Sequence, residues 1–384
     1  MTSRWPRVGL VGGGQLARMT APAAEALSVR LRVLALSAQE SAAQVIPEVV
    51  IGSHDDLVAL QALSRDCDVV TFDHEHVPPD QLAALSAAGV VLRPGPAALA
   101  HAQDKVVMRE ALAAAGVPCP PWTVASSAAD IVGFAERTGW PVVAKTSRGG
   151  YDGRGVWTLD SPAAAVALVD DVPLAPGARW LIEQRVPFVR ELSAQVARSP
   201  HGQAVAYPVV RTVQTDGICT EVVAPCPQLP AERATAAQQI ALQIAAALGV
   251  VGMLAVELFD TGTELLVNEL AMRPHNSGHW SIEGAVTSQF ENHLRAVLDL
   301  PLGSPRMLAP YAVMVNVLGG DKPDLYHAYL HCLARDPELK IHMYGKEVRP
   351  GRKVGHVTVL GDQLDDLLAR AHHAADYLTG VIDE

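Results

Sequence analysis

The stretch Leu254-Ala-Val-Glu-Leu-Phe-Asp-Thr-Gly-Thr-Glu-Leu-Leu-Val-Asn-Glu-Leu-Ala-Met-Arg-Pro-His-Asn-Ser-Gly-His-Trp280 carries more information about the fold than any other part of the chain. Leu254–Phe259 and Glu264–Leu270 are apolar, β-prone runs, and the glycine between them predicts a hairpin turn. Glu257 and Glu269 are an even number of residues apart. An even register would therefore put both carboxylates on one sheet face, roughly 7–8 Å apart as diagonal neighbours.

Two carboxylates on one sheet face indicate either a cation site or an exposed surface. Such acids repel each other and are costly to bury unless a cation lies between them. Magnesium uses one or two carboxylates plus substrate phosphate oxygens, so the pair is typical of a metal-nucleotide site. The alternative is an exposed hairpin with two solvated glutamates. Arg273, His275 and Asn276 follow the hairpin directly, and this density of polar groups favours the metal-nucleotide site.

The composition defines the class of protein. The chain has 384 residues, which is enough for two or three domains. Hydrophobic residues make up 49% and charged residues 18%, as in globular proteins. The net charge of −11 argues against binding to nucleic acid or to an anionic membrane. An anionic substrate must therefore be held by local clusters of basic residues.

The cysteines and the apolar segments bear on the cellular compartment. The five cysteines are odd in number and show no Cys-x-x-Cys spacing, so a reducing cytoplasm fits better than a disulfide framework or a zinc site. The N-terminus shows no basic-then-apolar signal peptide. The uncharged run Ala234–Val256 is long enough to span a membrane. Its three glutamines at helical spacing and Gly249 instead predict a surface helix followed by a buried strand.

Residues 1–103 alternate short apolar strands with alanine-rich helices. The predicted strands are Arg7–Val11, Leu31–Leu36, Asp68–Phe72 and Val90–Leu92, and the predicted helices are Gln15–Ala26, Leu57–Ser64 and Asp80–Ala88. This alternation predicts a doubly wound parallel sheet with right-handed crossovers. Its ligand crevice should lie at the carboxyl ends of the strands, where the loops Gly12–Ala17 and Asp73–Pro78 fall.

The first of these loops has three possible interpretations. Gly12-x-Gly14-x-x-Ala17 matches the dinucleotide fingerprint, but Leu36-Ser-Ala38 stands where an acid should end the second strand, and Glu40 is displaced. A nicotinamide or flavin cofactor is therefore disfavoured. The loop could still offer backbone amides and a helix N-terminus to another phosphate or ligand. Alternatively, the glycines serve only close packing of helix on sheet.

A second glycine-rich loop follows a helix at Asp104–Ala115 and a proline-rich break. The strand Pro141–Lys145 delivers a lysine to the segment Thr146–Gly155, which has four glycines in seven residues from Gly149. Such a loop lets backbone amides close over phosphates. It is not a Walker A motif. A bare surface loop would not need an apolar strand that leads a lysine into it, so the pattern favours a phosphate site.

Further strands are predicted at Trp180–Gln184, Leu192–Ala197 and His356–Leu360, with a last helix from Gln363 to about residue 378. Before that last strand, four basic residues occur within eight positions. They are Lys346, Arg349, Arg352 and Lys353. In an acidic protein this cluster favours an anion site over a solvated face.

Taken in order, these parts are those of an ATP-grasp site, in which a nucleotide lies between two α+β lobes. Four motifs resemble the 5-(carboxyamino)imidazole ribonucleotide synthase family of purine biosynthesis. They are Gly12-Gly-Gly-Gln-Leu-Ala-Arg-Met19, Gly149-Gly-Tyr-Asp-Gly-Arg-Gly155, Asn268-Glu-Leu-Ala-Met-Arg-Pro-His-Asn-Ser-Gly-His-Trp280 and Lys346-Glu-Val-Arg-Pro-Gly-Arg-Lys-Val-Gly-His356. The resemblance runs from about residue 7 to the C-terminus.

The resemblance implies an ATP-grasp fold of mixed α/β and α+β class. The expected domains are an N-terminal parallel-sheet domain at 1–103, an ATP-grasp domain at 104–305 with a flexible lid at about 118–186, and a small C-terminal domain at 306–384. The implied reaction is ATP- and bicarbonate-dependent carboxylation of 5-aminoimidazole ribonucleotide, with release of ADP and phosphate, via carboxyphosphate. These small molecules would be the only substrates, and a cytoplasmic homodimer is expected.

The same resemblance assigns site residues. Nucleotide binding falls to Lys105, Lys145, Gly150, Tyr151, Asp152, Gly153, Arg154, Gly155, Val156, Glu183, Gln184, Arg185, Val186, Glu191, Gln214, Asn268 and Glu269. Two magnesium ions would be held by Glu257, Glu269 and Asn268. In a regular strand Asn268 would face away from Glu269, so the strand must kink if both reach the site. Ribonucleotide binding falls to Gln15, Glu75, Tyr151, Asp152, Arg154, Lys346, Arg352 and Lys353.

The catalytic residues implied by the resemblance are Arg273, His275, Asn276, Asp152 and Lys145. Lys145 would neutralise charge on the transferred phosphoryl group, and Arg273, His275 and Asn276 would hold bicarbonate and the carboxyl of carboxyphosphate. His275 or Asp152 could accept the proton of the substrate amine. The sequence does not decide between them, nor between carboxyphosphate and CO2 as the species that the amine attacks.

Three departures from the family pattern stand out. The acidic loop reads Asp73-His-Glu-His76, where the family usually has Glu-Phe/Ile-Glu before Asn or His; Glu75 is retained. Met272 replaces a customary proline, and Gln214 stands where a histidine usually contacts the nucleotide. Glutamine keeps a donor and an acceptor but cannot titrate. The rival hypotheses are a sister ATP-grasp enzyme, a nicotinamide-dependent oxidoreductase and a non-catalytic relative.

Overall fold

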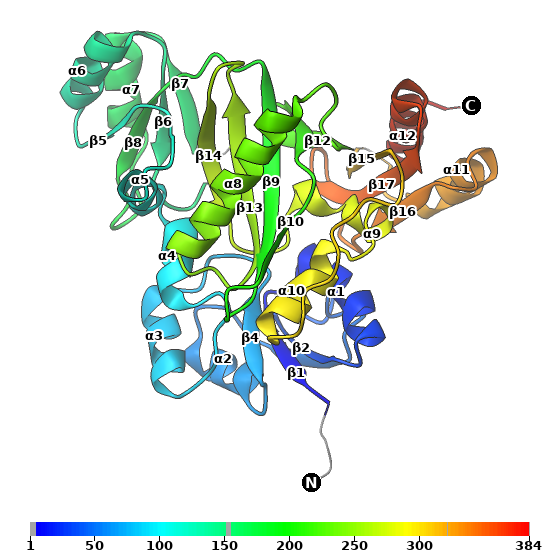
Figure 1. Cartoon of the computed structure of the whole chain (residues 1–384). Helices are drawn as coiled ribbons and strands as arrows, with labels where there is room; N and C mark the ends of the chain where they lie inside the picture. The colour runs from blue at the N-terminus through cyan, green and yellow to red at the C-terminus, as the bar shows by residue number, and fades with distance from the viewer. Residues whose placement is uncertain (1–4, 151–154, 321, 384) are drawn as a thin grey trace.

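The computed structural model describes residues 5–150, 155–320 and 322–383, and over these residues the strands form three sheets (Figure 1). A small parallel sheet belongs to the N-terminal part of the chain. A small antiparallel sheet forms a lobe at the upper left of the figure. The third and largest sheet crosses the centre of the molecule and continues into the C-terminal part.

The N-terminal part consists of β1 (Arg7–Val11), α1 (Gln15–Ala26), β2 (Arg30–Ala35), β3 (Glu48–Ile51), α2 (Leu57–Ser64), β4 (Val69–Phe72) and α3 (Pro79–Ala87). Its strands pair in parallel in the order β3-β2-β1-β4. Alternate residues of β1 face opposite ways: Leu10 packs on the side of α1, and Val11 on the side of α2 and α3. Helices therefore cover both faces, and the predicted doubly wound parallel sheet is confirmed.

Two details of this sheet differ from the prediction. The edge strand β3 was not predicted, because its short run Glu48–Ile51 is only half-buried and shows a weak apolar pattern. The predicted strand Val90–Leu92 is wrong, because it makes only an isolated bridge, Leu92 to Val70. Pro94 follows, and a proline has no amide hydrogen with which to extend the pairing.

The lobe follows two helices, α4 (Pro96–Gln103) and α5 (Lys105–Ala114). It consists of β5 (Trp122–Ala125), α6 (Ala128–Thr138), β6 (Val142–Thr146), β7 (Val156–Leu159), α7 (Pro162–Asp171) and β8 (Trp180–Gln184). The strands pair antiparallel in the order β5-β8-β6-β7, and α6 and α7 pack on the sheet through a separate apolar core. The lobe thus has its own sheet and its own core.

The large sheet contains nine strands among the described residues, and they pair antiparallel. The path β14-β13-β9-β11-β12-β15-β17-β16 gives their order, with β10 on the side of β9. The strands are β9 (Arg190–Arg198), β10 (Ala204–Ala206), β11 (Val210–Thr215), β12 (Ile218–Ala224), β13 (Gly252–Asp260), β14 (Leu265–Ala271), β15 (Tyr311–Leu318), β16 (Lys340–Met343) and β17 (Lys353–Gly361). Because β12 pairs with β15, one sheet joins the central hairpin to the C-terminal strands.

Helices cover this sheet and complete its cores. They are α8 (Ala231–Ala247), α9 (Ser281–Gly284), α10 (Gln289–Val297), α11 (Tyr329–Arg335) and α12 (Leu364–Thr379), with 3-10 turns η1 (Asn276–Gly278) and η2 (Tyr326–Ala328). Helix α8 lies across β9 and β13 and ends before β13 begins at Gly252, as predicted for Ala234–Val256 (Figure 1). In the described part of the chain, no helix has the length and apolar character needed to cross a membrane.

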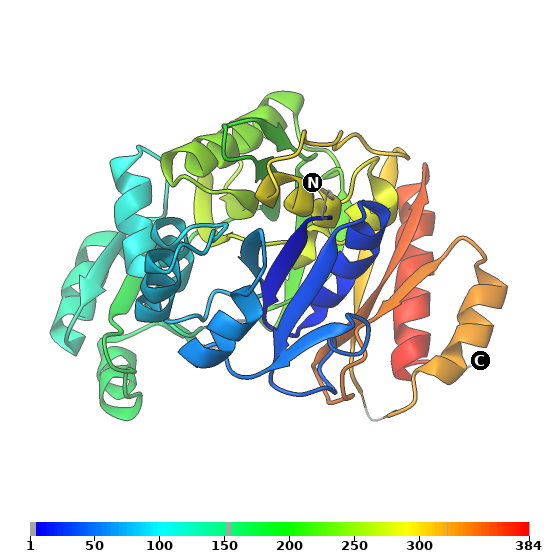
Figure 2. The same ribbon diagram turned by 90° about the horizontal axis from the view of Figure 1, so that it is seen from below.

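The N-terminal part docks on the large sheet through α10, which packs against α1 (Figure 2). His293 of α10 is fully buried at this junction. Its Nδ1 accepts a hydrogen bond from the amide of Met253 at 3.1 Å, and its Nε2 lies 2.8 Å from the hydroxyl of Thr71 on β4. Both ring nitrogens are therefore used when the imidazole is neutral. A second proton would have to displace the amide of Met253.

This arrangement predicts that acid destabilises the junction. Burial lowers the pKa of His293 to about 3, whereas an unfolded histidine has a pKa of about 6.5. The unfolded chain therefore binds more protons below pH ~6.5, and stability falls as the pH drops. His293→Gln should remove about 1.4 kcal/mol of the loss seen in the wild type between pH 7.5 and pH 5.5. Urea unfolding of both proteins at the two pH values measures this, and equal losses would contradict it.

Candidate active site

A cleft of about 1860 Å³ lies where the lobe, the large sheet and the N-terminal part meet. Its walls come from the lobe sheet, the large sheet, the start of α1, the segment after β4 and the loop before β17. The predicted residues that line it are Gln15, Glu75, Lys105, Lys145, Gly150, Val156, Glu183, Gln184, Arg185, Val186, Glu191, Gln214, Glu257, Asn268, Glu269, Arg273, His275, Asn276, Lys346, Arg352 and Lys353. The structure therefore brings residues from positions 15 to 353 to one cavity.

One described position is not among these residues, and four others cannot be placed. Gly155 is described but does not line the cleft; its carbonyl accepts a hydrogen bond from the amide of Thr146 at 3.0 Å. Tyr151, Asp152, Gly153 and Arg154 lie outside the described residues.

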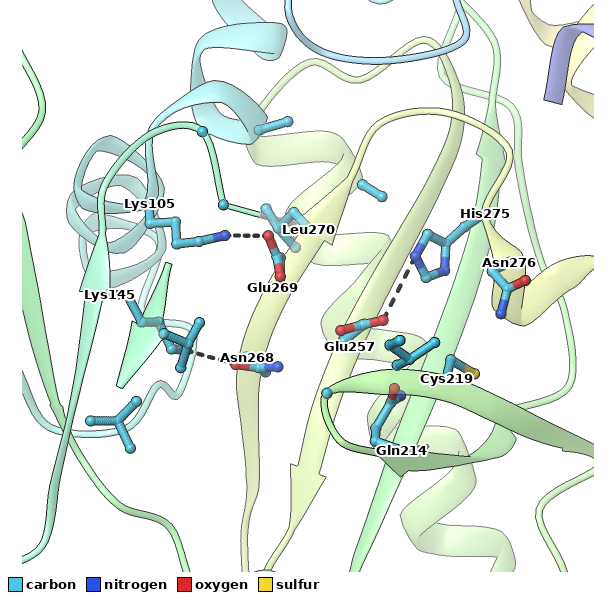
Figure 3. Close-up of a pocket in the computed structure, with 18 of the residues that line it drawn as sticks. Lys105, Lys145, Gln214, Cys219, Glu257, Asn268, Glu269, Leu270, His275 and Asn276 are labelled. Carbon is cyan, nitrogen blue, oxygen red and sulfur yellow. Dashed lines mark hydrogen bonds and ion pairs between the residues drawn. The ribbon is translucent and has the colours of Figure 1, made fainter. Parts of the chain in front are cut away.

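The acidic hairpin is formed by β13 and β14, as predicted. Its register differs from the predicted one: Glu257 and Glu269 pair directly across the two strands, so the expectation of diagonal neighbours is wrong. The cause is a β-bulge. Leu258 pairs with Val267, which leaves Asn268 as the extra residue on β14. The bulge provides the kink expected there, and both Asn268 and Glu269 line the cleft (Figure 3).

The two carboxylates carry different charge states. Burial, followed by the nearby Glu269 and Glu191, raises the pKa of Glu257 to about 7. Burial alone would also raise the pKa of Glu269, but the ion pair with Lys105 outweighs it and holds that pKa below its ordinary value. Near neutral pH, Glu257 can therefore carry a proton. A cation between the two carboxylates would displace that proton.

The donor set of the hairpin fits a hard cation. Two facing carboxylates and the amide oxygen of Asn268 are the oxygen ligands that magnesium prefers. In residues 5–150, 155–320 and 322–383, no three His, Cys, Asp or Glu side chains gather into a complete metal site. A cation held here would therefore need further oxygens from a substrate or from water, as magnesium does in nucleotide sites.

Lys145, near the end of β6, contacts the hairpin directly. It donates to Asn268 Oδ1 at 2.9 Å (Figure 3). It also pairs with Glu183 Oε2 at 2.6 Å. The carboxylate of Glu183 is 2% exposed, and its other oxygen accepts from Arg109 at 2.6 Å. Glu183 therefore contacts cations with its side chain, while Gln184, the next residue, lines the cleft at the strand end.

His275 and Asn276 follow the hairpin and begin η1. His275 Nδ1 lies 2.9 Å from the hydroxyl of Ser277, and Nε2 lies 3.7 Å from Glu257 Oε1 (Figure 3). Burial, followed by the charges of Arg273 and Lys353, lowers the pKa of His275 to about 3, so the imidazole is neutral. The amide nitrogen of Asn276 is buried without a hydrogen-bond partner. This orphaned donor fits the oxygen of an anionic ligand.

At the N-terminal side of the cleft, two contacts join distant parts of the chain. Arg273 donates to Glu75 Oε2 at 2.9 Å, and Lys346 donates to Gln15 Oε1 at 2.5 Å. The second oxygen of Glu75 is buried without a partner, so it can accept a hydrogen bond from a ligand. The loop after β4, the loop after β1 and the basic segment before β17 therefore meet at one end of the cleft.

The first glycine-rich loop is partly occupied by the protein itself. Asp73 accepts hydrogen bonds from the amides of Gly14 at 3.0 Å and Ala17 at 2.8 Å, at the N-terminus of α1. Those two amides are not available to a phosphate. This contact weakens the dinucleotide interpretation further, because the fingerprint depends on the same loop and helix N-terminus.

The four basic residues near position 350 are not equivalent. Arg349 pairs with Glu347 Oε2 at 2.5 Å, and its side chain is 66% exposed. Arg352 donates to the backbone carbonyl of Glu347 at 3.1 Å. Lys353 is the first residue of β17. Its positive charge offsets part of the rise in the pKa of Glu257. Arg352 and Lys353 therefore present cations at the cleft wall from adjacent positions.

Gln214 lies on β11 at a second β-bulge and lines the cleft (Figure 3). Burial raises the pKa of the nearby Glu191, and Gln214 lowers it in part. The departure from the family pattern thus lies near a carboxylate that the resemblance assigns to the nucleotide.

Sequence reasoning missed two residues beside the cleft. Arg109 contacts Glu183 and the backbone of Asn268, and its only signal was a basic residue on a buried face of α5. Cys219 on β12 lines the cleft among residues assigned to the site, and nothing in its sequence surroundings distinguished it from the other cysteines (Figure 3).

Known proteins resemble this chain over nearly its whole length. Three protein families match in order: the ribonucleotide synthetase preATP-grasp domain at residues 6–103, the ATP-grasp domain at 110–290, and the phosphoribosylaminoimidazole carboxylase C-terminal domain at 312–370. The N5-carboxyaminoimidazole ribonucleotide synthase of Mycobacterium tuberculosis is 56% identical over 97% of this chain and 88% of its own length. That of Corynebacterium ammoniagenes is 45% identical over 97% and 92%.

Solved structures agree with these matches. The N5-carboxyaminoimidazole ribonucleotide synthetase of Thermus thermophilus is 37% identical and superposes with a TM-score of 0.85 over 98% of this chain and 99% of that one. The Aspergillus clavatus enzyme in complex with ADP and 5-aminoimidazole ribonucleotide is 30% identical, with a TM-score of 0.88 over 97% and 98%.

Proposed function

This chain belongs to the N5-carboxyaminoimidazole ribonucleotide synthase family of ATP-grasp ligases, and from that premise we propose which of its residues carry out each part of the reaction. The enzyme carboxylates 5-aminoimidazole ribonucleotide at the expense of ATP in purine biosynthesis. The observation that carries the assignment is one cleft that holds a facing pair of glutamates at one wall and adjacent cations at another.

The nucleotide lies between the lobe and the large sheet. Lys105 and Lys145 are the partners of its phosphates, because both residues line the cleft and, within the described part of the chain, their ammonium groups pair with Glu269, Glu183 and Asn268 of the same site. We assign the adenine to the strand end Gln184–Val186 and the ribose to Glu191, from the family resemblance and because these residues line the cleft. Gly150 to Val156 form the cover over the phosphates, by resemblance to the family.

Glu257, Glu269 and the amide oxygen of Asn268 would hold magnesium, for which the family resemblance implies two ions. Their geometry on the bulged hairpin supports this, together with the proton that a cation would displace from Glu257. Bound magnesium supplies charge neutralisation to the phosphates during transfer. Lys145 adds a positive charge from β6, and Lys105 turns from Glu269 to a phosphate when the ligands are bound.

Bicarbonate lies beside Arg273, His275 and Asn276. The guanidinium and the orphaned amide nitrogen of Asn276 donate to its oxygens, and the neutral imidazole accepts or donates according to its tautomer. A bicarbonate oxygen attacks the γ-phosphorus, the bond to the ADP oxygen breaks, and carboxyphosphate forms. Because carboxyphosphate hydrolyses readily in water, the cover must exclude water before transfer.

The ribonucleotide lies at the N-terminal end of the cleft. We assign its 5′-phosphate to Arg352, Lys353 and Lys346 and its sugar and base to Gln15 and Glu75, which all line the cleft. The family resemblance adds Tyr151, Asp152 and Arg154, which lie outside the described residues. The free acceptor on Glu75 supports this placement. The exocyclic amine then attacks the carboxyl carbon of carboxyphosphate, or the CO2 that it releases, and phosphate departs. His275 or Asp152 takes the amine proton.

The experiment that tests this function measures ADP release from ATP and bicarbonate, with and without aminoimidazole ribonucleotide. Release should depend on the ribonucleotide, and the carboxylated product should form in equal amount. ADP release that does not respond to the ribonucleotide, with no carboxylated product, would contradict the assignment.

Three further expectations concern the domain boundaries, the cellular location and the oligomeric state. We propose domain boundaries near residues 103 and 305. The large sheet continues across the second boundary, because β12 pairs with β15. A cytoplasmic location is supported by free cysteines at positions 67, 119, 219, 226 and 332. A homodimer is proposed from the family resemblance, and light scattering on the purified protein tests it.

Gln214→His should make nucleotide affinity depend on pH. Above pH ~7.5 glutamine and neutral imidazole offer similar hydrogen bonds, so the two proteins should bind ATP alike. Below pH ~6 the histidine becomes charged and should favour a polyphosphate by up to ~1 kcal/mol at a partly exposed site. The ribonucleotide constant should not change. Calorimetric ATP affinities from pH 5.5 to pH 8 measure the effect, and parallel curves would place position 214 outside the nucleotide site.

A further inference from the structure

Arg109 is a fully buried cation on α5 that stands behind the wall of the cleft. Its Nε donates to Glu183 Oε1 at 2.6 Å, and its Nη2 donates to the backbone carbonyl of Asn268 at 2.7 Å. Both partners line the cleft. A charge buried this deeply is costly unless it is paired, so these contacts determine where the guanidinium lies.

The contact to Asn268 falls on the residue that the bulge leaves out of the strand pairing. Asn268 has no pairing partner on β13, because Glu269 pairs with Glu257 and Val267 pairs with Leu258. Arg109 supplies a donor to its carbonyl. Lys105, one helical turn earlier on α5, pairs with the side chain of Glu269. Helix α5 thus contacts two consecutive cleft-lining residues of β14, Asn268 and Glu269.

The contact to Glu183 matters when Lys145 moves. Glu183 is nearly fully buried and is shared between Arg109 and Lys145, which are both within 2.6 Å. If Lys145 turns toward a phosphate, Glu183 loses one of its two cations. Arg109 then remains as its partner, so no unpaired carboxylate is left in the buried wall.

We propose that Arg109 is a positioning residue for phosphoryl transfer: it fixes the bulge that brings Asn268 and Glu269 to one face, and it keeps Glu183 paired when Lys145 moves to the phosphates. The inference rests on the proposed role of Glu257, Asn268 and Glu269 as metal ligands. Arg109 itself touches no substrate, and it acts through the residues that it holds.

The test uses Arg109→Lys with Arg233→Lys as a matched control. Lysine keeps the positive charge opposite Glu183, but one ammonium cannot reproduce the planar fork that reaches two acceptors. Arg233 makes the same kind of contacts on the same hairpin, to Asp260 Oδ1 at 2.9 Å and to the carbonyl of Gly262 at 2.6 Å. It does so at the turn, away from the cleft. Calorimetry gives the affinity for ADP with and without magnesium, and thermal unfolding gives stability.

The ratio of the two affinities measures how much magnesium strengthens ADP binding. We expect Arg109→Lys to lower this ratio by about tenfold, the effect of one charge-assisted contact. Arg233→Lys should leave the ratio within about twofold of wild type. The two variants should change the unfolding temperature by similar amounts, and neither should change the affinity for the ribonucleotide. An unchanged ratio in Arg109→Lys, or equal losses in the two variants, would overturn the proposal.

Glu269→Ala, measured in the same way, tests the metal assignment separately from the role of Arg109. If it keeps the full effect of magnesium, the metal assignment is wrong and the role of Arg109 is overturned with it. If Glu269→Ala loses the effect and Arg109→Lys does not, only the role of Arg109 is wrong. Should Arg109→Lys not fold, Arg109→Met/Glu183→Gln removes both charges together, and a retained ratio in that protein also overturns the proposal.

Discussion

Replacing Glu269 or Glu257 with alanine is expected to lower turnover to less than about a hundredth of wild type while the fold remains intact. Each carboxylate faces the other across the bulged hairpin, and each is a proposed ligand of a cation that bridges the transferring phosphates. Such a cation accounts for several kcal/mol of the barrier to phosphoryl transfer, and each 1.4 kcal/mol is about tenfold in rate. Steady-state ADP release at ordinary magnesium measures the effect, and circular dichroism checks the fold.

Glu264→Ala is the matched control for this pair. Glu264 is exposed and lies at the turn of the same hairpin, outside the cleft. Its replacement should leave turnover close to wild type. The metal assignment would fail if both Glu257→Ala and Glu269→Ala kept more than about a tenth of wild-type activity, because a lost metal ligand has a larger effect than that.

Arg352→Ala and Lys353→Ala should each raise the Michaelis constant for the ribonucleotide by about ten- to a hundredfold. Each removes a charge-assisted hydrogen bond to a phosphate, worth roughly 1.5–3 kcal/mol. The Michaelis constant for ATP should change little with Arg352→Ala. Lys353 also lies near Glu257, so its replacement should affect ATP more than that of Arg352 does. Initial rates against each substrate in turn measure both constants.

Arg349→Ala provides the comparison for these two variants. Its guanidinium is mostly exposed and already pairs with Glu347, so its loss should change the ribonucleotide constant by less than about threefold. If all three variants weaken ribonucleotide binding equally, the effect is one of general charge rather than of a phosphate contact. If ATP binding weakens and ribonucleotide binding does not, the two substrates have been assigned to the wrong ends of the cleft.

The sequence was sufficient for much of the fold, because local patterns determine where regular elements form. The predicted bounds of β1, α1, α2 and β8 match those in the structure. The alternation of strand and helix in residues 1–103 also specified a parallel sheet with helices on both faces. The edge strand β3 was missed because it is short and half-buried, so tertiary pairing rather than its own pattern makes it a strand.

The site was predicted as a set of residues but not as a geometry. Parity along the chain put Glu257 and Glu269 on one face, yet the bulge at Asn268 makes them direct partners. A bulge adds one residue to one strand and leaves no reliable mark in a single sequence. Arg109 was missed for a related reason: its importance comes from partners 74 and 159 residues away, and only the folded chain brings these together.

The continuous large sheet has a consequence for inhibitor design. The hairpin of β13 and β14, which carries the proposed metal ligands, and the start of the basic cluster on β17 belong to one hydrogen-bonded sheet, whereas the lobe has a sheet of its own. The spacing between the proposed metal ligands and the start of the basic cluster is therefore set by strand pairing, whereas Lys145 and Gln184 belong to the sheet of the lobe. A bisubstrate compound that joins a nucleotide to a ribose phosphate would meet anchors already held in place, so a linker of matched length keeps the gain of preorganisation.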